Sequence, residues 1–237
     1  MKKMLLAGCS HSAGYGLEDI EQSWGNIFAK NNNHILTNVA KPASSLQYAT
    51  QSIINTISNE SFDTVILQLT TFDRYPISYN GYEKFLNNDI LSTNESEDKI
   101  FHLVLANYLE AVNGNDVPIE SKYVRFFYEK VVFSTFYLNT LINEIFILQE
   151  LLKHKGVDFI LIPYDNYFWG NESKMSIWRL PESKKIDKTR YVDYPFMKWL
   201  EDNYTSEDYF LDKGFHLNEA GHKIFAEEYL TQFITLK

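Results

Sequence analysis

The sequence has one cysteine, Cys9, among 237 residues. A single thiol cannot form an intrachain disulfide, so a disulfide-stapled scaffold is excluded and a reducing compartment is the simpler interpretation. Positive charge is also scarce, because 22 Lys and Arg face 31 Asp and Glu, which gives a formal net charge of −9. This acidic balance argues against nucleic acid or an anionic membrane surface as the main partner.

Long hydrophobic runs are lacking as well. No apolar run in the sequence approaches the roughly 18 residues of a transmembrane helix. The N-terminal MKKMLLAGC resembles a bacterial lipoprotein cleavage site, but its apolar part is about five residues, against roughly 7–15 in a signal peptide. Cleavage before Cys9 would also remove the first predicted strand. The expectation is therefore a cytoplasmic protein.

Apolar residues make up 45% of the chain, which is ample for a sizeable core. Short apolar runs, typical of buried strands, alternate with helical patterns. The predicted strands are 3–8, 35–39, 64–69 and 157–163. The predicted helices are 23–30, 44–58 and 218–233, and the helical pattern over 122–154 is either one helix or two. This alternation predicts a three-layer α/β/α fold with a parallel sheet of four or five strands, in one domain spanning 1–237.

Two stretches break this alternation, and we expect irregular insertions there, at about 74–121 and 164–206. The chain from 70 to 97 is polar and aromatic and reads as a long loop, whereas 98–112 has a helical pattern. Residues 208–211 are either a short fifth strand or an extended segment. The aromatic side chains of the second insertion either pack or cover the carboxyl edge of the sheet.

Polar residues follow each of the first three predicted strands. They are Cys9 to Ser12, Asn38 to Ser45 and Thr70 to Arg74. The carboxyl ends of parallel strands share one edge, where ligands bind in open α/β sheets, and the loop before the last helix can deliver His216 to it. A serine hydroxyl becomes a nucleophile when a histidine takes its proton, and a carboxylate behind the histidine fixes its tautomer. The pattern therefore favours acyl transfer.

These segments also resemble the conserved blocks of the SGNH (GDSL-type) hydrolases. GCSHSAGYG resembles the first block and DKGFHLNEAG the last, while NVAKPASS and LQLTTFDR resemble the second and third. The resemblance implies a flavodoxin-like sheet order 2-1-3-4-5. It also implies that Ser10 is the nucleophile and first oxyanion donor, His216 the base and Asp212 the acid that orients it.

The sequence departs from this family at the oxyanion hole. Ala43 stands at the place of the second-block glycine, and Phe72 at the place of the oxyanion asparagine. Thr70 or Thr71 could substitute by a hydroxyl, and Arg74 could supply charge. Asp212 lies four residues before His216, where the family has a spacing of three.

Other roles can be considered for His11, His222 and Cys9. His11 is expected to line the pocket but not to act as the base, because neighbouring side chains on an extended segment point apart. His222, on the last helix, is assigned to the surface or to packing. A metal site of Cys9, His11 and His216 lacks a paired ligand spacing, and Cys9 does not hold the nucleophile's position in the motif.

The function predicted from the sequence is a serine esterase of the SGNH type that cleaves a small acyl ester, such as an acetyl group on a carbohydrate. This chemistry needs no metal or organic cofactor. Two alternatives remain open: an O-acyltransferase on the same triad, and a catalytically silent binding protein. In the last case Ser10, His216 and Asp212 would be ordinary loop residues, and Thr70, Thr71 and Arg74 ordinary residues at a strand end. The sequence leaves the oligomeric state open.

Overall fold

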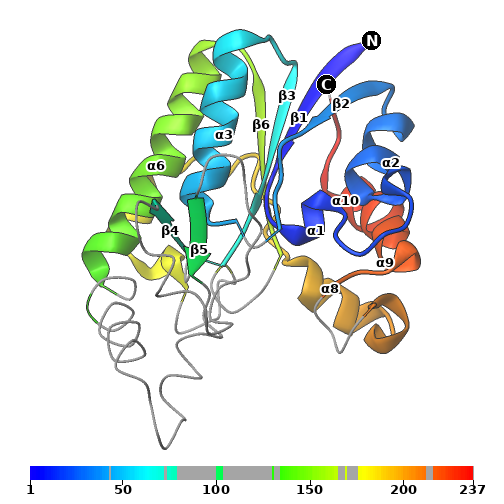
Figure 1. Cartoon of the computed structure of the whole chain (residues 1–237). Helices are drawn as coiled ribbons and strands as arrows, with labels where there is room; N and C mark the ends of the chain where they lie inside the picture. Colours follow the sequence, from blue (N-terminus) through cyan, green and yellow to red (C-terminus); the bar gives the residue numbers. More distant parts are fainter. Residues whose placement is uncertain are drawn as a thin grey trace, which may run out of the picture.

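The computed structural model describes residues 1–42, 44–71, 74–78, 100–103, 130, 134–164, 169, 176–211 and 216–236. A parallel sheet lies between two layers of helices, so the predicted α/β/α architecture is confirmed (Figure 1). Within the described ranges, no helix combines the length and the apolar character needed to cross a bilayer.

In the described part of the chain, the main sheet has four strands in the order β2-β1-β3-β6. Their bounds are Lys2–Ala7 for β1, His34–Asn38 for β2, Thr64–Leu69 for β3 and Asp158–Pro163 for β6. Every neighbouring pair is parallel, with Leu5 of β1 between Thr37 and Val65. All of β3 is buried, which explains its nearly continuous apolar run. The order agrees with the first four positions of the predicted 2-1-3-4-5 arrangement.

Among the described residues, a single residue rather than a strand lies at the fifth position, beside β6. Tyr191 forms an isolated parallel bridge with Leu161 of β6. The amide of Leu161 donates to the carbonyl of Arg190, and its carbonyl accepts from the amide of Val192, both at 3.0 Å. The alternative that 208–211 forms this strand is wrong, because Ser206–Tyr209 is a 3-10 turn, η5, and Phe210 bridges antiparallel to Leu217.

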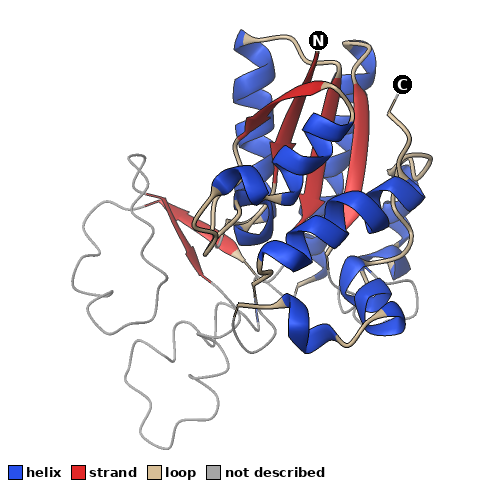
Figure 2. Cartoon of the chain, turned by 90° about the vertical axis from the view of Figure 1, so that its right-hand side faces the viewer, coloured by secondary structure: helices blue, strands red, loops and turns tan. Residues whose placement is uncertain are grey.

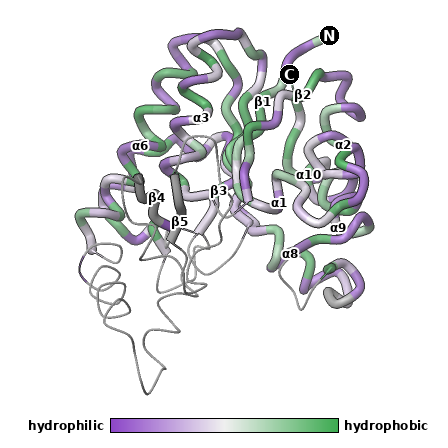
Figure 3. Tube along the Cα trace, in the orientation of Figure 1, coloured by the Kyte–Doolittle hydropathy of each residue, from purple (hydrophilic) through white to green (hydrophobic). Residues whose placement is uncertain are grey.

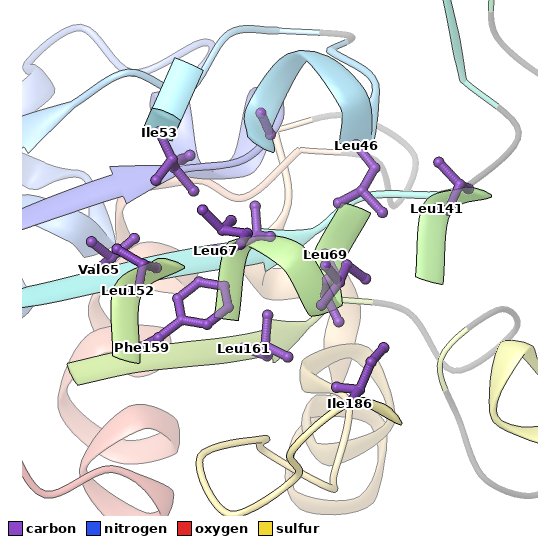
Figure 4. Close-up of a cluster of buried hydrophobic side chains, with 14 of the residues drawn as sticks. Leu46, Ile53, Val65, Leu67, Leu69, Leu141, Leu152, Phe159, Leu161 and Ile186 are labelled. Carbon is purple, nitrogen blue, oxygen red and sulfur yellow. The ribbon is translucent and has the colours of Figure 1, made fainter. Parts of the chain in front are cut away.

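Two helices cover one face of the sheet. They are α3 (Leu46–Asn59) and α6 (Thr135–His154), and the hydroxyls of Ser45 and Ser134 cap their first turns. Alternate residues of β3 point to this face, where Figure 4 shows them among leucine and isoleucine side chains from both helices. The residues labelled there from the sheet are Val65, Leu67, Leu69, Phe159 and Leu161.

The opposite face carries α2, α8 and the closing helix, which lie on the right in Figure 1 and face the viewer in Figure 2. Their bounds are α2 Trp24–Asn31, α8 Phe196–Asn203, α9 Glu219–Ile224, the π turn η6 Phe225–Tyr229, and α10 Leu230–Phe233. The predicted closing helix is thus confirmed, with a π turn in its middle. Apolar segments gather toward the sheet and polar ones toward solvent (Figure 3).

The two predicted insertions contain regular structure. β4 (Tyr75–Ser78) and β5 (Ile100–Leu103) form an antiparallel pair, so the prediction of a loop at the first and of a helix at the second is wrong. Four residues are too few to display a period. The second insertion contains α8 together with the 3-10 turns η3 (Ile177–Arg179) and η4 (Pro181–Lys185); another such turn, η1 (Ile20–Gln22), precedes α2. Residues 79–99 and 104–129 lie outside the described residues.

Glu144 is a partly buried carboxylate on α6. Burial raises the pKa of Glu144 from 4.5 to about 7, and its Oε2 has no hydrogen-bond partner among the described residues. Because the pKa of Glu144 is higher in the folded state than in the unfolded state, its protonated side chain contributes to the free energy of unfolding. This contribution is complete below pH 4.5 and is lost as the pH rises through 7. Glu144→Gln should therefore raise the free energy of unfolding at pH 8, by about 1 kcal/mol after solvent screening.

Urea unfolding at pH 5 and pH 8 checks this expectation. The gain in the free energy of unfolding of Glu144→Gln should be present at pH 8 and small at pH 5. Glu150→Gln, on an exposed turn of the same helix, is the matched control and should show no such pH dependence. An equal gain at both pH values would contradict the assignment to the Glu144 charge.

Candidate active site

Ser10 begins a one-turn helix, α1 (Ser10–Ala13), directly beyond β1. The turn ends at Gly14, whose φ of +70° is the left-handed conformation that glycine adopts without steric cost. The amides of Gly14 and Tyr15 both donate to the carbonyl of Ser10. Ser10 is buried, at 5% exposure, and α1 lies at the carboxyl edge of the sheet, the lower end in Figure 1.

The segment after β2 is hydrogen-bonded to β1 and to α1, the turn that carries Ser10 and that we call the serine turn. Asn38 Nδ2 donates to the carbonyl of Ser12 at 2.8 Å, and Ser44 Oγ donates to the carbonyl of Gly8 at 2.7 Å. These bonds join the ends of β1 and β2, as the parallel arrangement predicted. Ala43 and its predicted oxyanion role lie outside the described residues.

His216 comes to the same place from the far end of the sequence. It immediately precedes the turn into α9, and its carbonyl accepts from the amide of Leu211 at 2.7 Å. Its ring centroid lies 5.5 Å from that of His11 and 4.8 Å from that of Tyr15. The half-buried His216 is therefore brought beside the residue that follows Ser10. Asp212 lies outside the described residues.

His11 is a buried imidazole stacked on Tyr164. The two ring centroids are 3.6 Å apart and the planes differ by 17°. Burial, and then the nearby His216 and Arg74, lower the pKa of His11 well below 6.5. Its Nδ1 has no hydrogen-bond partner among the described residues. His11 is therefore expected to be neutral near pH 7, which makes it a poor general base. Its Nδ1 is left available for a hydrogen bond to a bound molecule.

The segment after β3 supplies three of the remaining predicted residues, of which Thr70 and Arg74 make hydrogen bonds to other segments. Thr70 is buried, and its hydroxyl donates to the carbonyl of Thr71 at 3.2 Å, while its own carbonyl accepts from Trp169 Nε1 at 2.9 Å. Arg74 Nη1 contacts the carbonyl of Ser44 at 3.4 Å. Arg74 therefore links the segments after β2 and β3 and places a positive charge near His11.

Thr71 is half-buried at the same strand end, whereas Phe72 and Asp73 lie outside the described residues. Within the described ranges, no three His, Cys, Asp or Glu side chains are grouped as metal ligands. Cys9 is buried, with its Sγ 3.8 Å from Gln68 Oε1.

Tyr15 and Gln68 were not among the predicted site residues, and Tyr164 was named only as part of the aromatic stretch that either packs or covers this edge. Tyr164 directly follows β6, so the rule that places ligand-binding residues at the carboxyl ends of strands could have found it. Gln68 was visible as the one amide in an otherwise apolar strand end. Tyr15 carried no signal beyond its closeness to Ser10 in the sequence.

No family model matches the sequence, and no curated protein matches it. Solved structures do match over nearly the whole chain. A catalytic mutant of Axe2, an acetylxylan esterase from Geobacillus stearothermophilus, aligns with a TM-score of 0.57 and 10% identity, covering 98% of this chain and 94% of that one. A lipolytic protein of the G-D-S-L family from Desulfitobacterium hafniense aligns with a TM-score of 0.55 and 14% identity over 99% and 100%. The chain has the G-D-S-L fold.

A third structure with this fold, the esterase EstA from Pseudoalteromonas sp., aligns with a TM-score of 0.54 and 12% identity over 98% and 96% of the two chains. These matches show the fold that the sequence blocks implied. In this G-D-S-L fold, the turn that follows β1 carries Ser10, and the segment before the closing helix carries His216.

Proposed function

We propose that this protein is a serine ester hydrolase in which Ser10 is the nucleophile and His216 the general base. One observation carries the proposal: the ring of His216 lies 5.5 Å from that of His11, the neighbour of Ser10, although nearly the whole chain separates them. An imidazole beside the residue that follows a buried serine, at the carboxyl edge of a parallel sheet, suits acyl transfer.

The reaction proceeds in two displacements. Ser10 Oγ attacks the ester carbonyl while His216 takes the hydroxyl proton, and the alcohol leaves with that proton from the imidazolium. Water then attacks the acyl-serine with the same assistance, which releases the carboxylic acid and restores Ser10. Asp212 is assigned to orient His216.

Oxyanion stabilisation is assigned to the groups after the first three strands. The amides of Ser10 and Ala43 are the predicted backbone donors, and Thr70 or Thr71 takes the place of the missing asparagine. Because the Thr70 hydroxyl already donates to the carbonyl of Thr71, the Thr71 hydroxyl is the better candidate. Arg74 adds positive charge on the same side.

The proposed substrate is a small acyl ester, such as an acetyl group on a carbohydrate. The acetylxylan esterase Axe2 shares this fold, and two tyrosine rings, Tyr15 and Tyr164, lie against the histidines of the site. Aromatic rings are suited to contact the apolar face of a sugar. His11, neutral and stacked on Tyr164, is assigned to contact the bound substrate.

A serine-reactive fluorophosphonate and p-nitrophenyl acetate together test the proposed function. The wild type should hydrolyse the ester and be labelled at Ser10, as located by peptide mass spectrometry. Ser10→Ala should lose both properties, whereas Ser58→Ala, at the exposed end of α3, should keep them. Absence of labelling at Ser10 in the wild type would reject the esterase and favour a binding protein on this fold.

A further inference from the structure

Gln68 is a fully buried amide inside β3. Its neighbours Leu67 and Leu69 point into the core beneath α3 and α6, so Gln68 points to the opposite face, which carries α1. There its Oε1 accepts a hydrogen bond from the Ser12 hydroxyl and lies 3.8 Å from Cys9 Sγ. The two residues that flank the Ser10–His11 pair thus meet at one oxygen atom of the central strand.

Gly8 makes this close approach possible. A Cβ at Gly8 would lie 2.8 Å from Gln68 Cβ and 2.6 Å from Ser12 Oγ, distances that real Cβ atoms essentially never show. The end of β1 therefore passes directly against the Gln68 side chain. Two hydrogen bonds to Ser12 therefore fix the serine turn. The Ser12 hydroxyl donates to Gln68, and the Ser12 carbonyl accepts from the side chain of Asn38.

The Gln68 amide lowers the stability of the folded state. Gln68 Nε2 is buried and has no hydrogen-bond partner among the described residues. An unsatisfied buried donor destabilises the folded state, and an apolar side chain of the same size would carry no such donor. A buried group that costs stability at a site is expected where it serves function instead.

We propose that Gln68 is a positioning residue: it holds α1 against the end of β3 and so fixes the location of the Ser10 hydroxyl. Its effect on catalysis rests on the proposed role of Ser10. Its effect on the turn does not, because Cys9, the only thiol in the sequence, reports on the same turn without any reaction at Ser10.

Alkylation of Cys9 by iodoacetamide under native conditions tests the effect on the turn. Gln68→Met keeps the size of the side chain but removes its oxygen, and should speed alkylation about tenfold or more through local opening. Leu67→Met is the matched control, since it places the same side chain on the same strand toward the opposite core. It should change the rate by less than about twofold, because volume-conserving swaps cost little.

Ser12→Ala removes the other half of the hydrogen bond and should also speed alkylation. The double variant should be no faster than the faster single variant, because both changes break one interaction. An unchanged rate in Gln68→Met, or an equal acceleration in Leu67→Met, would overturn the proposal. This result can be read even if the protein hydrolyses no ester.

The kinetic arm separates the two proposals. In an active enzyme, Gln68→Met should lower kcat about 10- to 100-fold and leave KM within about threefold, because a misplaced nucleophile loses reactivity rather than substrate affinity. The melting temperature should stay near that of the wild type, because Gln68→Met removes the unpaired Nε2 donor but also takes away the acceptor of the Ser12 hydroxyl. Faster alkylation of Cys9 with an unchanged kcat would reject positioning of Ser10. A wild type without activity would reject the esterase, and the alkylation rates would still decide whether Gln68 holds the turn.

Discussion

Replacement of His216 by glutamine should lower kcat for p-nitrophenyl acetate by about 10³- to 10⁴-fold. Glutamine can form hydrogen bonds but cannot take a proton from Ser10 at neutral pH, so the variant loses the general base and keeps much of the site's shape. Labelling of Ser10 by a fluorophosphonate should slow by a comparable factor, since it depends on the same activated oxygen.

His11 offers the decisive comparison. His11→Phe keeps a ring to stack on Tyr164 but removes both nitrogens. Because the pKa of His11 is already held well below 6.5, this variant should lose about tenfold or less in kcat. His154→Gln, at the exposed end of α6, should match the wild type. A loss in His11→Phe as large as that in His216→Gln would transfer the base role to His11.

Acidification should lower the free energy of unfolding because of His222. The closing helix buries this side chain to 1% exposure, and its Nδ1 accepts from the amide of Trp24 at 3.2 Å. Burial lowers the pKa of His222 from 6.5 to about 4. The folded pKa is the lower one, so its stabilisation is complete above pH 6.5 and is lost as the pH falls toward 4. The difference corresponds to about 3 kcal/mol.

Urea unfolding between pH 7.5 and pH 4.5 measures this loss. His222→Gln keeps an acceptor for the Trp24 amide without a titrating group, and its free energy of unfolding should fall less steeply with acid. His11 contributes in the same direction, so part of the slope should remain. His154→Gln should reproduce the wild-type curve. If His222→Gln and the wild type lost stability in parallel, the burial of His222 would not be the cause.

The four sheet strands could be predicted because each is a short apolar run that ends in polar residues. The prediction succeeded for β3 to the residue, since a strand buried on both faces contains almost nothing else. α8 was missed although Phe196, Trp199 and Leu200 have helical spacing. Those residues lie in an aromatic-rich stretch, where the eight-residue pattern is too short to stand out.

The site was partly predictable for a related reason. The carboxyl ends of parallel strands lie at one edge of the sheet. The strand predictions alone therefore placed Ser10, Asn38 and Thr70 at that edge, without any distance between them. It could not indicate that His11 stacks on Tyr164 or that Ser12 bonds to Gln68, because such contacts depend on the register and rotation of packed elements. The roles given to Asp212 and Ala43 stay predictions.

The single-residue bridge at Tyr191 has a consequence for how copies of this chain can meet. It occupies both hydrogen-bonding groups of Leu161, in the middle of β6. A strand from another molecule would have to break those bonds to extend the sheet there, which is a known protection against edge-to-edge aggregation. In the described sheet, β2 is the other outer strand, and only five residues long. The bridge at Tyr191 therefore protects the longer of the two outer strands from pairing with another molecule at Leu161.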